Sequence, residues 1–186
     1  IPPLLDEVEA ELERIRQAAL EVELAGNRAE LDEIGEGLRD LGYAPPGAGG
    51  RARAKPAPPL SVKSPDGLTI LVGRNSRQND DLTFRRASGT DWWFHARGVP
   101  GSHVIVLGAG EELPRATVRR AAELAAYYSR ARQDASVVVD YTQRRHVRRI
   151  PRAAPGLVNY SQERTIRVTP LGPGAAEESR SPEQPG

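Results

Sequence analysis

The chain has 186 residues, 38% of them hydrophobic, which is enough for one domain of ordinary size with appendages and too little for a large multidomain enzyme. It contains no cysteine, which excludes disulfides, thiolate metal sites and a cysteine nucleophile and fits a reducing cytosol. The net charge is +1, no apolar run is long enough to span a membrane, and the N-terminus lacks the pattern of a secretory signal, so we expect a cytoplasmic protein with no membrane partner.

Residues 1–42 are predicted to form two acidic amphipathic helices, over 4–24 and 29–41. They carry 12 acidic and 4 basic side chains, a net charge of −8. In the first helix the apolar residues follow a three-four spacing: Leu4, Leu5, Val8, Leu12, Ile15, Ala19 and Val22. This spacing is typical of the end of a coiled coil whose partner helix lies elsewhere, and a plain two-helix hairpin without a binding role is the alternative. Because the chain starts inside this helix and contains no methionine, we expect it to be a fragment.

Residues 43–59 are rich in Gly, Pro and Ala and are predicted to be a flexible linker. Short strands follow. The segments 60–63 and 68–72 flank the turn sequence Ser64-Pro65-Asp66-Gly67 and predict a hairpin. A short helix is expected around 78–84, and the strands 91–96 and 102–107 are expected to form a second hairpin around Pro100-Gly101.

Residues 114–133 give the clearest helix pattern in the chain, with Pro114 in the first turn and a stripe that is mostly alanine. Strands are predicted at 136–141 and 165–168, and a disordered tail from residue 171 to 186. The predicted fold class is therefore α+β: residues 60–170 form a mostly antiparallel sheet with one main helix packed on it, preceded by the helical arm and the linker.

Positive charge is concentrated in the second half of the chain. Residues 113–168 contain 12 arginines and 4 acids, a net charge of +8. Codon bias explains arginine in place of lysine but does not explain this concentration. Arginine binds phosphate through two parallel hydrogen bonds, and aromatic rings stack on unpaired bases, so a basic surface beside exposed Trp or His suits RNA. The residues that offer this mixture are Trp93, His95, Arg97, Arg144, Arg145, Arg148 and Arg149.

A two-residue turn centred on Pro100-Gly101 would fix which side chains share a face of the second hairpin. It would place Trp93 with Val104, on the face opposite Trp92 and Phe94, which we interpret as packing residues. For Trp93 itself, packing and stacking remain equally open. The same geometry places His95 and His103 on opposite faces, so the three histidines of the chain do not predict a metal site.

A second polar group follows the first hairpin and consists of Arg74, Asn75, Gln78 and Asn79. These residues predict either an RNA-contacting loop or side chains that cap the next helix. We find no nucleophile elbow, phosphate-binding loop or paired metal carboxylates. The sequence therefore predicts a noncatalytic protein without a cofactor or a small-molecule substrate.

Three segments of the chain, in this order, resemble the RNA-binding domain of the NFACT family, called NFACT-R. They are Val72-Gly73-Arg74-Asn75-Ser76-Arg77-Gln78-Asn79-Asp80, then Asp91-Trp92-Trp93-Phe94-His95-Ala96 with Pro100-Gly101-Ser102-His103-Val104-Ile105-Val106, then Val139-Asp140-Tyr141-Thr142 with His146-Val147-Arg148-Arg149. The resemblance covers about residues 60 to 170, and the preceding helices also resemble the family. One departure is that arginine stands at 148, 149 and 152, where the family usually has lysine.

The resemblance implies a ribosome quality-control factor that binds large ribosomal subunits obstructed by peptidyl-tRNA. It would contact ribosomal RNA and tRNA and support tRNA recruitment for tailing of the stalled chain, with alanine in bacteria. Older labels of the family imply an alternative, a fibronectin-binding or adhesin-like module that binds proteins. The motifs add Ser102, His103 and His146 to Arg74, Asn75, Gln78, Asn79, Trp93, His95, Arg97, Arg144, Arg145, Arg148 and Arg149 as candidate RNA-binding residues.

Overall fold

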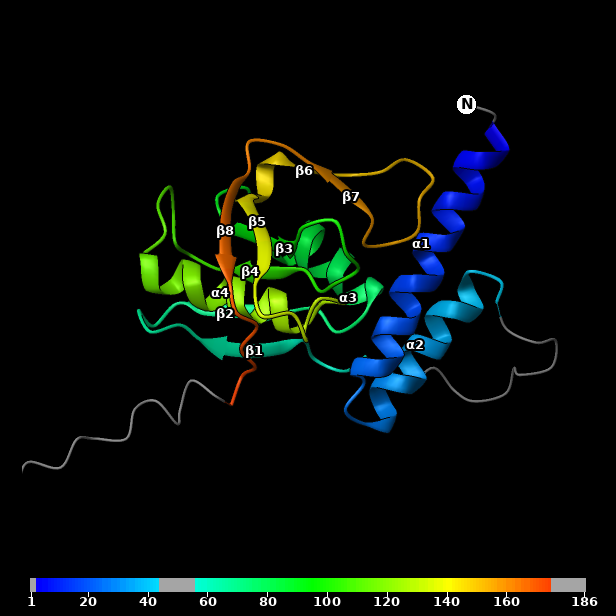
Figure 1. Ribbon diagram of the computed structural model, residues 1–186, viewed down its shortest axis with the longest axis horizontal. Helices are drawn as coiled ribbons and strands as arrows, with labels where there is room; N and C mark the ends of the chain where they lie inside the picture. The colour runs from blue at the N-terminus through cyan, green and yellow to red at the C-terminus, as the bar shows by residue number, and fades with distance from the viewer. Residues whose placement is uncertain (1–2, 44–55, 175–186) are drawn as a thin grey trace, which may run out of the picture.

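The computed structural model describes residues 3–43 and 56–174. It contains a six-stranded sheet that is antiparallel throughout, in the order β1-β2-β4-β3-β5-β8 (Figure 1). The strands are β1 (Leu60–Lys63), β2 (Thr69–Val72), β3 (Trp92–Ala96), β4 (Val104–Val106), β5 (Val137–Gln143) and β8 (Arg164–Val168). The predicted fold class, an antiparallel sheet with a main helix, is therefore confirmed.

Helix α4 (Arg115–Tyr127) covers one face of the sheet. Its alanines at 121, 122, 125 and 126 are fully buried, and their small side chains let the helix lie close to the strands. Trp92 and Phe94 of β3 point into this layer, as predicted for packing residues. This layer is the main hydrophobic core of the domain.

The opposite face of the sheet carries a second, smaller core. It is covered by α3 (Ser76–Asp81), the π-helical turn η1 (Leu82–Arg86) and a separate two-stranded sheet of β6 (Val147–Arg149) and β7 (Val158–Tyr160). Leu82, Trp93, Ile105 and Val147 are buried together between these elements and the sheet. Neither β6 nor β7 was predicted, because each has only three residues and lies in a segment rich in Arg, Gly and Pro.

The hairpin of β3 and β4 has a different register from the predicted one. Trp93 pairs with Ile105 and Phe94 with Val104, so Trp93 shares a face with Ile105 and not with Val104. The connection between β3 and β4 is longer than a two-residue turn, because Gly101 within it does not pair with the hairpin. Gly101 forms an isolated β-bridge with Ser129, which follows α4. The prediction that placed Trp93 with Val104 was wrong for this reason.

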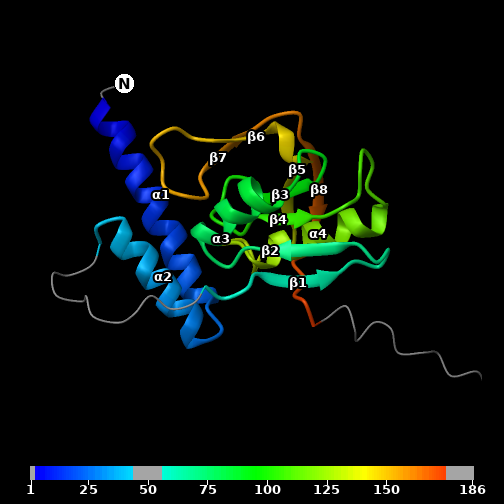
Figure 2. The same cartoon turned by 180° about the vertical axis from the view of Figure 1, so that it is seen from behind.

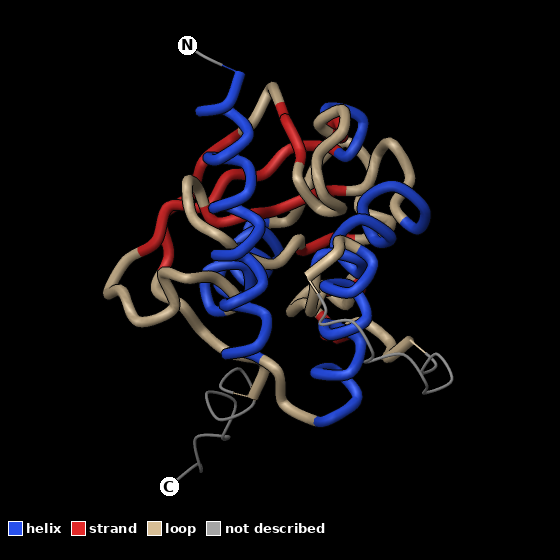
Figure 3. The backbone as a smooth tube through the Cα atoms, turned by 90° about the vertical axis from the view of Figure 1, so that its right-hand side faces the viewer, coloured by secondary structure: helices blue, strands red, loops and turns tan. Residues whose placement is uncertain are grey.

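The arm consists of α1 (Pro3–Leu24) and α2 (Arg28–Asp40), which lie side by side at one end of the domain next to α3 (Figures 1 and 2). Both helices agree with the predicted ones. Figure 3 shows the two helices in front of the strands. Much of the apolar stripe of α1 is exposed, for example Val8 at 56% and Ile15 at 51%, whereas Leu20 is buried. An uncovered stripe of this kind agrees with the coiled-coil interpretation.

The C-terminal part differs from the prediction at its start. Residues 171–174 lie against α4, where the buried Arg120 donates hydrogen bonds to the carbonyl oxygens of Leu171, Gly172 and Pro173. The predicted disordered tail therefore does not begin at residue 171. Residues 175–186 and most of the predicted linker, 44–55, lie outside the described residues.

Candidate nucleic-acid interface

A group of arginines lies on the second face of the domain, directly after β5. Arg144 and Arg145 belong to the single 3-10 turn η2 (Arg144–His146), and Arg148 and Arg149 belong to β6. Val147 between them is fully buried in the second core, while Arg148 and Arg149 are exposed. The buried Val147 fixes the local backbone, and we call Arg144, Arg145, Arg148 and Arg149 the basic cluster.

Phe84 of η1 holds two guanidinium groups of the basic cluster. The guanidinium carbon of Arg149 lies 4.0 Å from the centre of the Phe84 ring, and that of Arg144 lies 5.1 Å from it. Burial, and then the charges of Arg148 and Arg149, lower the pKa of Arg144. The shared contact with Phe84 places the positive charges of Arg144 and Arg149 close together, a suitable arrangement for a polyanion.

The four arginines of the cluster differ in how far protein carboxylates neutralise them. Arg149 forms two hydrogen bonds with Asp80, at 2.8 and 2.9 Å, and Arg145 pairs with the exposed Glu111 at 3.2 Å. Within the described part of the chain, Arg144 and Arg148 have no carboxylate within ion-pair distance. Their side chains donate instead to backbone carbonyl oxygens, and the positive charge is left uncompensated.

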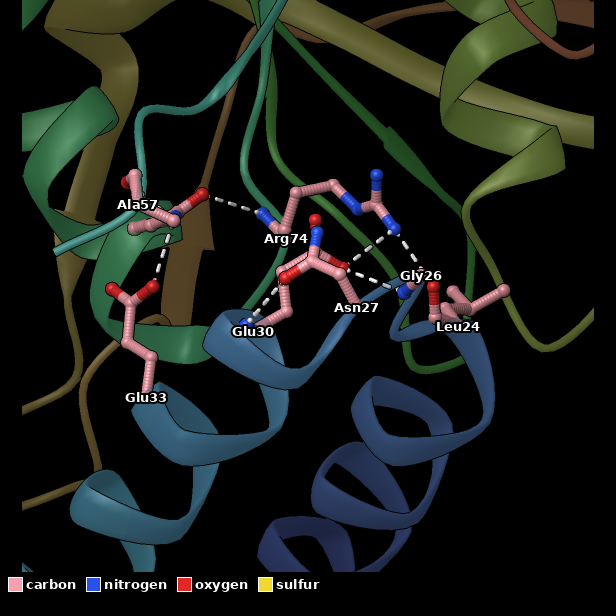
Figure 4. A network of polar contacts seen from close by, with 8 residues as sticks. Leu24, Gly26, Asn27, Glu30, Glu33, Ala57 and Arg74 are labelled. Atoms are coloured by element: carbon pink, nitrogen blue, oxygen red, sulfur yellow. Dashed lines mark hydrogen bonds and ion pairs between the residues drawn. The ribbon is translucent and has the colours of Figure 1, made fainter. Parts of the chain in front are cut away.

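Arg74 lies away from this cluster and fastens the arm to the domain. Its guanidinium donates to the carbonyl oxygen of Leu24 at 2.7 Å and to the Glu30 carboxylate at 3.2 Å (Figure 4). The side chains of Arg74 and Glu30 are only 14% and 13% exposed. A guanidinium that is enclosed in this way contributes to the arm–domain contact and is not available to RNA.

The other three residues of the predicted polar group are buried and structural. Asn75 caps α3, accepting a hydrogen bond from the backbone N–H of Gln78 at 2.9 Å. The Gln78 amide oxygen accepts from the backbone N–H of Arg74, and the Asn79 amide oxygen accepts from the backbone N–H of His103. The structure supports helix capping, one of the two predicted roles of this group. The other prediction, a loop that contacts RNA, is corrected.

Arg97 also forms an ion pair within the domain, although half of its side chain is exposed. It donates two hydrogen bonds to the carboxylate of Asp140, at 2.8 and 2.6 Å. Asp140 is buried and also accepts from the hydroxyl groups of Tyr160 and Thr165. Arg97 therefore holds strands β3, β5 and β8 together, and it does not join the basic cluster.

Trp93, predicted as a residue that packs or stacks on RNA, is fully buried. Its ring is stacked on that of His95 at 5.6 Å and lies 4.8 Å from that of Tyr160. Ser102 and His103 are buried as well. The prediction that Trp93, Ser102 and His103 contact RNA is therefore corrected, because all three side chains are buried, with 6% exposure or less.

His95 and His103 lie on the same face, with ring centres 5.6 Å apart, contrary to the predicted opposite faces. The β3–β4 register causes this, since it places positions 95 and 103 opposite each other. Even so, no group of three or more His, Asp or Glu side chains in residues 3–43 and 56–174 is arranged to hold a metal ion. His95 is partly covered, and His146 of η2 is partly exposed beside Arg145.

Trp93, His95 and His103 line a cleft of about 920 Å³ between the domain and the arm. Acidic side chains outnumber basic ones on its wall: Glu13, Glu21, Glu33 and Asp40 against Arg14 and Arg77. Acidic side chains in this position repel phosphate groups. The cleft is therefore a poor site for the RNA backbone, which leaves the basic cluster as the candidate interface.

We predict that the buried His103 makes the folded domain less stable in acid. Burial, and then the nearby His95, lower the pKa of His103 from 6.5 to about 3, so the ring is neutral in the folded protein. The unfolded chain takes up the proton first as the pH falls. The neutral His103 therefore makes its full contribution to the free energy of unfolding above pH 6.5. This contribution is lost as the pH falls from 6.5 to 3. Burial also lowers the pKa of His95, which adds an effect of the same sign.

We expect the free energy of unfolding to decrease between about pH 6.5 and 5 by roughly 1 kcal/mol per pH unit. Urea denaturation at a series of pH values measures it. His103→Gln should make this dependence weaker. Equal stability at both ends of this pH range would contradict the burial of a neutral His103.

Sequence reasoning missed two residues that hold arginine side chains in place, Phe84 for the basic cluster and Asp140 for Arg97. Phe84 directly precedes Arg85-Arg86 and is one of only two phenylalanines, which was a usable signal for an aromatic residue among cations. Asp140 lies in a β-branched strand, Val137–Gln143, where a lone carboxylate needs partners if it is buried. Its partners are Arg97, directly after β3, Tyr160 of β7 and Thr165 of β8, and only the fold brings them together.

Comparison with known proteins agrees with this architecture. Residues 60–161 match the model of the NFACT protein RNA binding domain. The curated protein "Rqc2 homolog RqcH" of Bacillus subtilis is 40% identical over 163 residues, 86% of this chain and 28% of that protein. Its namesake in Streptococcus suis is 38% identical over 145 residues, 76% of this chain and 26% of that protein. The chain thus spans little more than a quarter of the length of these relatives.

A solved structure has the same fold. It is titled as the C-terminal part of the fibronectin/fibrinogen-binding protein from Streptococcus suis, and it matches with a TM-score of 0.85 and 35% sequence identity. The match covers 90% of this chain and 67% of that one. The arm is therefore part of the shared architecture. Strand β8 lies beyond residues 60–161 yet completes the sheet, so the structural unit is longer than the family match.

The fold and the family match define an RNA-binding domain of α+β class attached to a helical arm. The chain belongs to the NFACT family, and residues 60–161 carry its RNA-binding domain. In the described residues, no helix has both the length and the apolar character needed to cross a membrane.

Proposed function

We propose that this chain binds RNA through the basic cluster, as the RNA-binding part of a cytoplasmic ribosome quality-control protein. One observation carries the proposal: the four arginines gather on one face of the domain, and two of them, Arg144 and Arg148, have no carboxylate partner among the described residues. The domain match to an RNA-binding family and the names of the curated relatives support it. No catalytic step is part of the proposal.

The proposal can be made more specific about which RNA the chain binds. The partners would be ribosomal RNA of the large subunit and tRNA, on subunits obstructed by peptidyl-tRNA, with recruitment of tRNA for the addition of a C-terminal alanine tail. Its support is the family membership of the chain together with the position of the basic cluster. Since the chain spans 28% of the Bacillus subtilis relative, we expect it to supply RNA affinity and not the whole tailing activity.

A salt series tests the RNA-binding proposal. The 186-residue chain is titrated with unmodified tRNA at salt concentrations from about 50 to about 200 mM, and binding is followed by fluorescence anisotropy. Each phosphate that an arginine neutralises releases counterions, so affinity should fall steeply with salt. Absence of binding at low salt, or an affinity that does not depend on salt, would contradict the proposal.

A second candidate is protein binding, which the name of the fibronectin/fibrinogen-binding protein from Streptococcus suis favours. In this case the same basic face would meet an acidic protein surface. The test is direct binding of the chain to fibronectin, with tRNA as competitor. Binding of fibronectin that tRNA does not displace would favour this candidate, and binding of tRNA alone would favour the proposed function.

A further inference from the structure

The distribution of aromatic rings limits what kind of RNA the chain can recognise. Proteins that bind single-stranded RNA present exposed aromatic rings on which the unpaired bases stack. The chain has two Trp, five Tyr and two Phe residues, all of them in the described part. Only Tyr43 is exposed, at 40%, and it follows the acidic helix α2. The rings of the domain are all buried or partly covered.

The two rings that contact arginines of the basic cluster, Phe84 and His146, are already in use. Phe84 is partly buried, packs against the second core, and lies in contact with the guanidinium groups of Arg144 and Arg149. The His146 ring is partly buried, and its Nε2 atom lies 3.4 Å from Nε of Arg145. A base that stacked on Phe84 would have to displace an arginine that the RNA backbone requires. The cluster thus offers guanidinium groups and no free stacking platform.

These guanidinium groups are also held in fixed directions. Arg144 donates through Nε to the carbonyl oxygen of Thr83 at 2.7 Å, and Arg148 donates through Nη1 to the carbonyl oxygen of Arg145 at 2.5 Å. Arg149 is held by its two hydrogen bonds to Asp80. Each guanidinium has five N–H donors, so each keeps donors for a phosphate. Donors fixed in this way match phosphates whose spacing is itself fixed.

We infer that the RNA element bound by the basic cluster is a base-paired segment, recognised through its phosphate groups. This inference rests on the proposed function and adds the class of RNA. A paired A-form helix presents phosphates at regular positions and hides its base faces, which agrees with fixed arginines and covered rings. A single strand would need stacking, and it would lose more conformational freedom on binding. Binding should then depend little on base sequence, since phosphate contacts carry no sequence information.

The test compares two RNAs with the same number of phosphates on the whole 186-residue chain. One is a hairpin with about 16 base pairs, and the other is an unstructured poly-uridine strand. We expect the hairpin to bind at least about tenfold more tightly at equal salt, and to keep its affinity when base pairs are exchanged.

Two outcomes separate the inference from the proposed function. Equal or tighter binding of the single strand would overturn the inference and leave RNA binding through the cluster intact. Failure of both RNAs to bind at low salt would overturn the proposed function and the inference with it.

Discussion

Trp93→Ala should lower the free energy of unfolding by about 3–5 kcal/mol, the usual cost of removing a large buried aromatic side chain. Trp93 is fully buried, in a core with only three other buried residues, Leu82, Ile105 and Val147. The cavity would open directly beneath β6, which carries Arg148 and Arg149. Denaturation in urea, followed by circular dichroism, measures the loss.

The matched control is Trp93→Phe. The indole N–H of Trp93 is buried and has no hydrogen-bond partner, so phenylalanine removes an unsatisfied donor and keeps a ring. We expect a loss below about 1.5 kcal/mol and unchanged RNA affinity. If Trp93→Phe instead kept its stability and lost RNA binding, Trp93 would be a stacking residue and its buried position in our account would be wrong.

Asp140→Asn is the second substitution with a large expected effect, a loss of about 2 kcal/mol or more at neutral pH. The carboxylate of Asp140 accepts hydrogen bonds from Arg97, Tyr160 and Thr165. Asparagine keeps one acceptor oxygen and turns an N–H group toward these donors. Strands β3, β5 and β8 would lose the charge that joins them.

The same carboxylate predicts a dependence on pH. Burial alone raises the pKa of Asp140, but the hydrogen bonds from Arg97, Tyr160 and Thr165 outweigh burial and hold the pKa below its ordinary value of 3.8. The contribution to stability is therefore present above pH 3.8 and is lost as the pH falls through the lower, folded-state pKa. The stability difference between wild type and Asp140→Asn should shrink in acid. A difference that persists at the lowest pH would contradict a charged Asp140.

Local patterns were enough to predict most of the elements. The Ser64–Gly67 turn and the two arm helices each depend on nearby residues and lie where the spacing placed them. The alanine stripe of α4 also packs as predicted, but the helix ends at Tyr127 and not at residue 133. The register of β3 and β4 could not be predicted in this way. It depends on the pairing of Gly101 with Ser129, which are 28 positions apart in the sequence.

For the candidate site as well, some features follow from local sequence and others do not. Arg144, Arg145, Arg148 and Arg149 were found from charge alone, because they follow one another in the sequence. Arg74 and Arg97 have the same chemistry, but their carboxylate partners, Glu30 and Asp140, lie 44 and 43 positions away. No local pattern distinguishes a guanidinium that binds RNA from one that meets a distant carboxylate.

We propose that the uncompensated arginines of the basic cluster bind RNA phosphates. Two double variants that lose the same charge test this proposal: Arg144→Gln with Arg148→Gln in the cluster, and Arg115→Gln with Arg119→Gln on α4, on the opposite face of the sheet. The measurement is the slope of log affinity for the RNA hairpin against log salt concentration.

We predict that the cluster variant binds at least about tenfold more weakly and that its slope is shallower by about 0.9 for each lost phosphate contact, while the α4 variant keeps the wild-type slope. Equal slopes for the cluster variant and the wild type, or an equal loss in both variants, would contradict the claim.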